Sequence, residues 1–427
     1  MTGRYRWFVV FLLFAVTVVN YIDRSAISFA VHRIQSEYNL SSSQIGLILG
    51  AFGIGYIIST LFGGMAVDRF GAKRAYFVAV LAWAVSIGWT GAATGFLMLY
   101  AARTALGLAE GPSFPTTTSA ITRWLPPQER ATALGGALVA VPIALAIGAP
   151  LVTLLIGMFD WRAMFFILAV ASLIWLPFWL VFYANDPSES DRIGSEEAEH
   201  IAHSGREEPP MAQSPPRAHV WKALLTTPTL WANYWAYFVF GYYLFFFMTW
   251  LPEYLRKSYD LDLSSVGLVS FLPWATAAVL LIAFGRWSDA ILKRTSSLRL
   301  ARSYQIAGTQ LVAALAIIPV ALSSNIVVAV AGITVAVAAS MAANAAYYAV
   351  IADLVPRVAG TAMGIMTIFF AASGFLAPVI TGYALEITGD FRPAFWLITA
   401  LAASSVIGIV VFHHPDRDAR RLGPELK

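Results

Sequence analysis

Long apolar runs separated by short polar stretches make up most of this chain. Each run is near or above the roughly 20 residues that an α-helix needs to cross about 30 Å of bilayer hydrocarbon. Only helices and closed barrels satisfy their backbone groups in hydrocarbon, and these runs are too long for barrel strands. The pattern therefore predicts an all-α membrane protein with twelve transmembrane helices. The predicted spans are Trp7–Val31, Gln44–Val67, Arg74–Ala93, Phe96–Thr122, Ala131–Phe159, Trp161–Ala184, Leu230–Leu255, Ser264–Phe284, Ser303–Leu322, Ile326–Ala352, Gly360–Ile387 and Pro393–Phe412.

One long polar segment divides the runs into two sets of six. Residues 185–220 are rich in Pro, Ser, Glu and His, a composition typical of a flexible tether in which a short amphipathic helix is possible. The predicted domains are an N-terminal six-helix bundle at residues 1–184, a cytoplasmic linker at 185–228, and a C-terminal six-helix bundle with a short tail at 229–427.

The two halves repeat short sequence features at a spacing of roughly 220 to 230 residues. Gln44–Leu47 recurs as Ser265–Leu268, and Ala131–Gly135 recurs as Gly360–Gly364. A nearly constant spacing predicts two pseudo-symmetric halves related by a parallel repeat.

Composition and charge narrow the class of protein. The 427 residues are 59% hydrophobic and only 12% charged, which excludes a soluble globular domain. The net charge of +4 comes from basic residues scattered over short loops, so we expect no nucleic-acid partner. There is no cysteine and no phosphate-binding loop, and the six histidines lie outside or at the edges of the apolar runs. We therefore expect no metal site, no cofactor and no enzymatic activity.

The basic loop residues gather on one side of the predicted bundle. Lys and Arg are enriched in cytoplasmic loops of membrane proteins, so both termini and the linker are predicted to be cytoplasmic. We expect a multi-pass monomer in the cytoplasmic membrane of a bacterium, in contact with the lipid bilayer.

Four charged residues interrupt the first and fourth predicted spans: Asp23, Arg24, Arg103 and Glu110. A charge at the bilayer centre costs roughly 2.5 to 3.5 kcal/mol on insertion scales, so such residues face a partner or a wet cavity. We expect an Asp23–Arg103 pair, with Glu110 about two turns deeper and less well paired. Acids in such positions are candidates to bind and release protons. The alternative is a structural salt bridge that never titrates.

The predicted loop between the second and third spans reads GGMAVDRFGAKR at Gly63–Arg74, and a weaker copy begins at Gly285. This pattern resembles the loop signature of the major facilitator superfamily, which implies the major facilitator fold. Its charged residues are expected to latch one conformation and release the other. The candidate gating residues are Asp68, Arg69, Arg74 and Asp289. The alternative is a solvated loop that serves only membrane orientation.

A closer resemblance covers nearly the whole N-terminal half. Tyr21–Arg24, Arg103–Glu110 and the stretch from Phe114 to Arg130 are similar to the anion:cation symporter family, which includes sugar-acid carriers. The resemblance implies a proton-linked carrier of organic anions. It implies that Arg24 binds the substrate carboxylate and that Tyr56 lines the pocket. It also implies that Asp23 and Glu110 titrate and that Arg103 is the family's helix-four arginine.

The C-terminal half departs from the sugar-acid carriers. Where those carriers have amide side chains, this chain has Val141, Thr367 and Ala371. A site without hydrogen-bond partners binds a polyol poorly, so we expect a less hydroxylated or aromatic substrate. The remaining candidate polar residues of the pocket are Asn233, Tyr234, Tyr237, Asn344, Tyr347, Tyr348 and Thr367.

Together these features predict a secondary transporter that takes up a small organic anion with protons by alternating access. One alternative is an exporter of an amphiphilic or siderophore-like compound by proton antiport. Another is a membrane-embedded enzyme or sensor, which would need a soluble module or a metal cluster.

Overall fold

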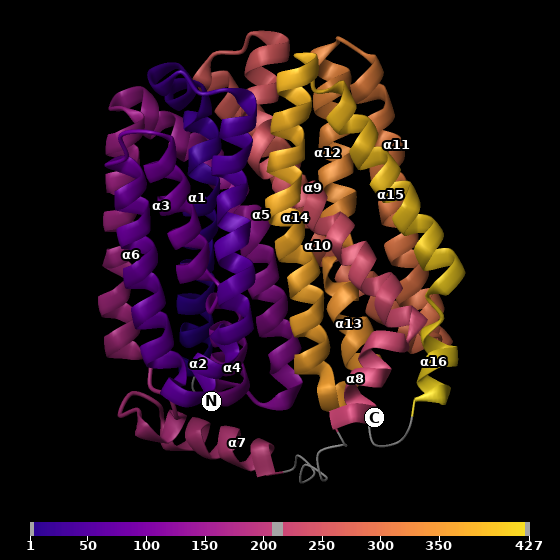
Figure 1. The fold of residues 1–427 in the computed structure, drawn as a ribbon. Coiled ribbons are helices and arrows are strands. Elements are labelled where there is room, and N and C mark those ends of the chain that lie inside the picture. The colour runs from indigo at the N-terminus through magenta and orange to yellow at the C-terminus, as the bar shows by residue number, and fades with distance from the viewer. Residues whose placement is uncertain (1–3, 207–216, 423–427) are drawn as a thin grey trace.

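The structure is a computed structural model that describes residues 4–206 and 217–422, and these residues are almost entirely helical (Figure 1). The N-terminal half contains α1 (Tyr5–Tyr38), α2 (Ser42–Gly91), α3 (Phe96–Glu110), α4 (Ser113–Trp124), α5 (Pro127–Met158) and α6 (Trp161–Phe182). The connecting segment contains η1 (Pro187–Glu189), α7 (Ser195–Arg206) and α8 (Arg217–Thr226). The C-terminal half contains α9 (Pro228–Tyr259), α10 (Leu263–Thr295), η2 (Arg299–Ser303), α11 (Tyr304–Leu322), α12 (Ile326–Ala342), α13 (Asn344–Leu354), η3 (Pro356–Val358), α14 (Ala359–Thr388), α15 (Arg392–Phe412) and α16 (Pro415–Arg421).

Every predicted span coincides with a helical segment, and the all-α fold class is confirmed. α2 supplies two spans, α3 and α4 together supply one, and α12 and α13 together supply another. By length and hydropathy alone, ten helical segments among the described residues qualify as membrane spans. The other two are α3 with α4, which is interrupted at Gly111, and α9, in which many Tyr and Trp side chains lower the mean hydropathy.

Two helical arms of α2 meet at Gly71, whose backbone angles (φ 77°, ψ 158°) are not helical. A side chain at this position would be strained, and a Cβ would lie 2.7 Å from the Asn185 amide. The Asn185 Oδ1 accepts a hydrogen bond from the Lys73 backbone N–H at 3.0 Å, so it caps the second arm. The predicted loop between the second and third spans is therefore a sharp bend without an extended segment.

The two halves lie side by side and seal against each other at the end opposite the termini (Figure 1). There α2 and α14 pack backbone to backbone, because a Cβ on Gly46 would lie 2.8 Å from the Pro378 carbonyl oxygen. The Glu386 carboxylate of α14 accepts hydrogen bonds from the Ser41 hydroxyl and the Ser43 backbone N–H, both at 2.8 Å.

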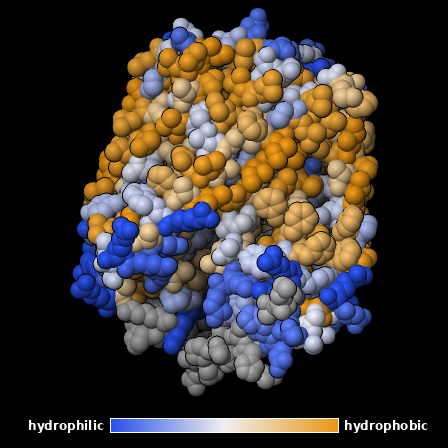
Figure 2. All heavy atoms as spheres, turned by 180° about the vertical axis from the view of Figure 1, so that it is seen from behind, coloured by the Kyte–Doolittle hydropathy of each residue, from blue (hydrophilic) through white to orange (hydrophobic). Residues whose placement is uncertain are grey.

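The opposite end of the molecule is polar and hollowed between the halves, below a broad apolar band (Figure 2). Both described chain ends, α7 and α16 lie at this end (Figure 1). The structure is therefore closed at the end far from the termini and open at the end that carries them.

A buried carboxylate from a short peripheral helix caps the first membrane helix of each half. Glu197 of α7 accepts hydrogen bonds from the backbone N–H groups of Tyr5 and Arg6 at 3.1 Å. Asp418 of α16 accepts hydrogen bonds from the backbone N–H of Thr229 at 3.3 Å and from its hydroxyl at 2.7 Å. An acid at a helix N-terminus satisfies free N–H groups and complements the helix dipole, so these contacts fasten α7 and α16 to the bundle.

The predicted linker at residues 185–228 includes the helices α7 and α8. Its two Pro-Pro pairs lie among residues 207–216, outside the described residues. The division of the chain at residues 185 and 228 stays a prediction.

Candidate functional site

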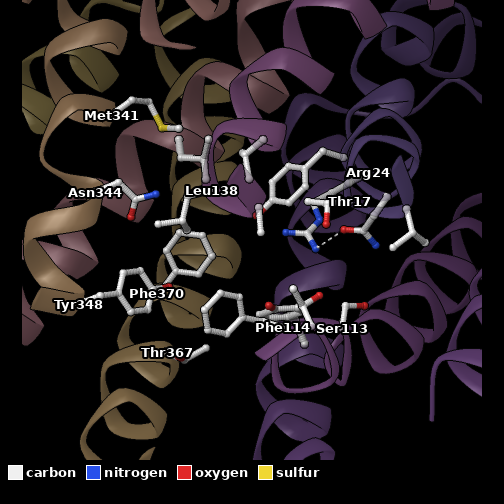
Figure 3. Close-up of a pocket in the computed structure, with 18 of the residues that line it drawn as sticks. Thr17, Arg24, Ser113, Phe114, Leu138, Met341, Asn344, Tyr348, Thr367 and Phe370 are labelled. Atoms are coloured by element: carbon white, nitrogen blue, oxygen red, sulfur yellow. Dashed lines mark hydrogen bonds between the residues drawn. The ribbon is translucent and has the colours of Figure 1, made fainter. Parts of the chain in front are cut away.

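A cavity of about 90 Å³ lies between the two halves, and residues of both halves line it (Figure 3). The N-terminal half contributes Thr17, Asn20, Tyr21, Arg24, Tyr56, Ser113, Phe114, Thr117, Leu138 and Val141 among others. The C-terminal half contributes Tyr237, Phe240, Leu244, Met341, Asn344, Tyr348, Thr367 and Phe370. The wall is mainly aromatic and aliphatic, with a small number of polar groups, which is typical of small-molecule sites.

Arg24 is the charged residue that lines this cavity, and it forms a buried ion pair with Glu110. The guanidinium of Arg24 donates two hydrogen bonds to Glu110 Oε2, from Nε at 3.0 Å and from Nη2 at 2.7 Å. The same Nη2 donates to the Asn20 Oδ1 at 3.2 Å. Arg24 is 2% exposed and Glu110 is 0% exposed, so water does not screen their attraction. The pair joins α1 to the end of α3.

The expected pairing of the four charges was therefore wrong. Glu110 has a full cationic partner in Arg24, although no basic residue lies at contact spacing along its own helix. Asp23 accepts a hydrogen bond from the Ser172 hydroxyl of α6 at 2.6 Å, and Arg103 donates to the Arg24 carbonyl oxygen at 3.2 Å. Adjacent residues of α1 point to different neighbours, and sequence spacing did not reveal which acid each arginine meets.

Several polar atoms of this cluster have no hydrogen-bond partner among the described residues. They are Arg24 Nη1, Glu110 Oε1, Asp23 Oδ1, Asn20 Nδ2, and Arg103 Nε and Nη1. Buried polar atoms are normally paired, so unpaired ones at a cavity mark places where a ligand or water binds. Because Arg24 lines the cavity, its Nη1 is a donor available to an anion.

Aromatic rings hold the Arg24 guanidinium in place. Its Cζ lies 4.4 Å from the ring centroids of Tyr21 and Phe52, and 5.2 Å from that of Tyr56. A cation at such distances is attracted to the ring faces. The rings also exclude water, so a ligand carboxylate at Arg24 would lie in a site of low dielectric constant.

The C-terminal wall presents hydroxyl groups and aromatic faces. The hydroxyls of Tyr237 and Tyr348 share a hydrogen bond of 2.7 Å, and the rings of Tyr237 and Phe370 stack at 5.3 Å. The Asn344 Oδ1 is buried without a partner, and the Thr367 hydroxyl donates to its own helix at Met363. Phe114 packs against Tyr348 at 5.6 Å, so rings of both halves meet at the cavity.

Six of the nine predicted binding residues line the cavity, namely Arg24, Tyr56, Tyr237, Asn344, Tyr348 and Thr367. Asn233 does not, because its Nδ2 donates to the Tyr347 carbonyl oxygen at 3.1 Å inside the C-terminal half. Tyr234 packs against Trp231 and Phe369 away from the cavity. Tyr347 is likewise turned inward, where its hydroxyl accepts from Gln310 at 2.8 Å.

Polar residues one and two turns before Arg24 also line the cavity, although they were not among the predicted binding residues. Thr17, Asn20 and Tyr21 line the cavity together with Arg24, at the spacing of one helical face. That spacing was visible in the sequence and could have identified them. Ser113, Phe114 and Thr117 gave no comparable signal, because they follow the break between α3 and α4.

Comparison with known proteins settles the family. The sequence model of the Major Facilitator Superfamily matches residues 13–347. The chain belongs to the major facilitator superfamily. It is 32% identical to the hexuronate transporter of Bacillus subtilis (strain 168), over 95% of this chain and 94% of that protein. As a superfamily member with these helical spans, it is a multi-pass membrane transporter.

Two further relatives are named as probable transporters of acidic compounds. This major facilitator protein is 31% identical to a probable sulfoacetate transporter of Cupriavidus necator, over 94% of each chain. It is 29% identical to a probable galactarate/D-glucarate transporter of Bacillus subtilis, over 96% of this chain and 92% of that protein.

Solved structures of the same fold include a bacterial homolog to the human lysosomal transporter Spinster, in an inward-facing and unoccupied conformation. The TM-score is 0.73 at 17% identity, covering 100% of this chain and 99% of that one. At this identity the likeness shows the fold alone.

The charged residues of the loop signature form an ion pair in the C-terminal half but not in the N-terminal half, among the described residues. Asp68, Arg69 and Arg74 form no ion pair among the described residues, and all three are exposed. In the C-terminal half, Arg302 binds Asp289 at 3.0 Å and Asp353 at 3.3 Å. The gating role of these residues stays a prediction. In the present conformation only the C-terminal copy is engaged.

Proposed function

We propose that this transporter takes up a small organic anion together with protons, by alternating access across the cytoplasmic membrane of a bacterium. The observation that carries the proposal is the ion pair between Arg24, which lines the inter-half cavity, and the fully buried Glu110. A buried arginine is suited to a carboxylate or sulfonate, and a buried acid in contact with it is suited to a proton. The names of the relatives support an acidic substrate.

We propose that substrate and Glu110 compete for the same guanidinium. In the structure, Arg24 Nε and Nη2 both donate hydrogen bonds to Glu110 Oε2. A proton on Glu110 removes its charge and weakens its hold on Arg24. The guanidinium then binds the substrate anion, so a proton and an anion enter the cavity together.

Asp23 is the second candidate proton carrier. Its side chain is buried and accepts a hydrogen bond from the hydroxyl of Ser172, and it forms no ion pair among the described residues. Arg103, near both acids, donates to the α1 backbone and would hold the helix in place while the charges change. Transfer of one proton or two would leave Asp23 and Glu110 in different charge states, and the number of protons transferred sets the proton-to-substrate ratio.

The direction of opening supports an inward-facing state. The basic loops and both described chain ends lie at the open end of the bundle, and the positive-inside rule assigns such an end to the cytoplasm. In an alternating-access cycle the seal between α2 and α14 would open as the hollow in Figure 2 closes.

The cavity wall favours a substrate with few hydroxyl groups. Val141 and Thr367 line the cavity, and neither has an amide side chain. The hydroxyl of Thr367 already donates a hydrogen bond within its own helix. Instead Tyr237, Tyr348 and Phe370 supply aromatic faces. An aromatic or short aliphatic monoanion would fit this wall better than a hexonate, because hydroxyl groups left without partners on burial cost affinity.

The test is uptake into proteoliposomes that contain the purified full chain. With an inside-alkaline pH gradient, radiolabelled benzoate, sulfoacetate and glucuronate are offered in turn. The proposal expects at least one to accumulate inside, with an accumulation that collapses when a protonophore is added. Accumulation only under the reversed gradient would establish proton antiport and overturn symport. Accumulation that ignores both the pH gradient and the protonophore would overturn proton coupling.

A further inference from the structure

A second pocket lies at the open end of the C-terminal half, where α16, η2 and the end of α15 meet. Its volume is about 410 Å³, and six residues line it: Arg299, His414, Asp416, Arg417, Arg420 and Arg421. Four of these six are arginines. None of these residues lines the cavity between the two halves.

The one acid of the pocket forms no ion pair with the arginines. Asp416 accepts hydrogen bonds from the backbone N–H groups of Leu298 and Arg299, both at 2.9 Å, and so caps the start of η2. Its carboxylate forms no ion pair among the described residues. Because four arginines and one acid line the pocket, the lining carries a net positive charge.

The arginines differ in how much they are engaged. Arg417 pairs with Asp418 at 2.8 Å, whereas Arg420 and Arg421 are exposed and form no ion pair in the described part of the chain. Arg299 donates from Nη2 to the Val410 carbonyl oxygen at 3.2 Å, while its Nε is buried without a partner. One guanidinium is thus held in position with a free donor, and two more can reach an anion.

The pocket lies directly beside lipid-facing apolar surface. Next to Arg299 along the chain, Leu300 and Tyr304 are 44% and 48% exposed. Next to His414, Val411 and Phe412 are 52% and 54% exposed at the end of a membrane span. A cluster of arginines at the end of such a surface matches an amphiphile that places an anionic group below apolar chains.

From this juxtaposition we propose that the pocket binds the phosphate group of an anionic phospholipid, whose acyl chains lie on the exposed apolar side chains of α11 and α15. Guanidinium groups bind phosphate through paired hydrogen bonds. In a zwitterionic lipid the headgroup's own cation competes with the arginines for the phosphate. A free phosphate would use the arginines but not the apolar surface.

A bound lipid would also help to hold helices of the C-terminal half in position. α16 carries Asp418, which caps α9 at Thr229, and Asp416, which caps η2 just before α11. A lipid that holds α16 would therefore brace the starts of two membrane helices of the C-terminal half. This role is separate from substrate binding.

The experiment is native mass spectrometry of the purified full chain with added phosphatidylglycerol or phosphatidylcholine. We expect one phosphatidylglycerol to be retained at least tenfold more tightly than phosphatidylcholine. The double variant Arg420→Gln/Arg421→Gln should lose this preference by about tenfold, because two charge-assisted contacts are removed. Both side chains are exposed, so the variant should keep its fold, which gel filtration and thermal unfolding check.

The matched control is Lys293→Gln/Arg294→Gln, which removes the same charge from exposed residues of α10 outside the pocket. The control should retain the preference. An equal loss in both double variants would show a general attraction to basic loops and overturn the site. If millimolar inorganic phosphate displaces the lipid, and phosphatidylglycerol is retained no more tightly than phosphatidylcholine, the pocket is a free-anion site and the lipid assignment is overturned.

Discussion

Arg24 of α1 and Glu110 at the end of α3 form a buried ion pair of 2.7 Å, and Arg24 also lines the cavity between the two halves. Glu110 accepts from two donors of the guanidinium, while a third, Nη1, has no partner among the described residues. In the proposed cycle this ion pair weakens when the substrate anion binds to Arg24.

Replacing Arg24 should abolish anion binding. In Arg24→Ala the substrate loses a charge-assisted contact in a site of low dielectric constant, which we expect to lower affinity at least 100-fold, or roughly 3 kcal/mol. Arg24→Lys should recover only part, because an ammonium cannot bind an anion through two parallel donors. Affinity is measured by ligand-induced thermal shift with the substrate found in the uptake screen. Unchanged affinity in the alanine variant would make Arg24 structural.

The stability of the same variants separates binding from folding. Arg24→Ala leaves the Glu110 carboxylate buried without its cation, at a cost of roughly 3 to 5 kcal/mol. Arg24→Ala/Glu110→Gln should regain most of this stability while still failing to bind the anion. If the double variant regains binding as well, the arginine acts only through folding.

Glu110→Gln should separate exchange from accumulation. The amide imitates a permanently protonated Glu110, so the variant should bind substrate and exchange it in counterflow. It should fail to concentrate substrate under a pH gradient, with a loss of at least tenfold. Glu37→Gln, which alters an exposed pair with Arg162, serves as the control and should keep both activities. Concentrative uptake that persists in Glu110→Gln would leave Asp23 as the remaining candidate proton carrier.

Val141→Gln should broaden the substrate range towards sugar acids. Val141 lines the cavity, and the resemblance to the sugar-acid carriers implies an amide side chain at this position. An added amide offers two donors and an acceptor to substrate hydroxyls, and each hydrogen bond contributes about 1 kcal/mol. Competition against uptake of the preferred anion should therefore show about a fivefold gain for glucuronate. A gain of equal size for benzoate would show that the effect is not hydroxyl recognition.

Gly53→Ala should shift the protein away from the inward-facing state. A Cβ at Gly53 would lie 2.4 Å from the backbone nitrogen of Phe375 in α14, so the seal between α2 and α14 must move apart. Overpacking costs roughly 1 to 3 kcal/mol, which corresponds to a change in conformer ratio of about tenfold. Gly64→Ala on the same helix, where a Cβ meets nothing within 4 Å, is the control.

The absence of cysteine makes this shift easy to measure. A single Thr367→Cys substitution places a thiol in the cavity, and its labelling by a membrane-impermeant reagent reports which side is open. Labelling from the outside should rise with Gly53→Ala and stay at the background level with Gly64→Ala. No change in either variant would show that this glycine contact does not control the seal.

Glu197→Gln should loosen the first membrane helix. The charged side chain caps the N-terminus of α1 and binds the Arg6 guanidinium at 2.8 Å. Loss of the charge at a buried cap should lower stability by about 1 to 2 kcal/mol, seen as a lower Tm. Glu196→Gln changes an exposed neighbour on the same helix and should leave the Tm in place. Equal shifts in both variants would assign the effect to the net charge of α7.

The architecture of this protein could be predicted from its sequence. Twelve spans, two repeated halves and the loop signature at Gly63–Arg74 follow from local patterns, because a helix in hydrocarbon satisfies its own backbone and needs only length and composition to be recognised. Single residues of the site were also visible where a charge or a polar side chain interrupted an apolar run, as with Asp23, Arg24 and Glu110.

Which of these residues are in contact depends on how the helices pack, and the sequence did not reveal it. Arg24 and Glu110 belong to different helices, and their contact depends on how α1 and α3 are rotated and shifted against each other. Asn233 faces the interior of its own half, while Tyr237, one turn later on the same helix, faces the cavity. Helical spacing relates residues within one helix, but pairs between helices depend on packing that no single segment encodes.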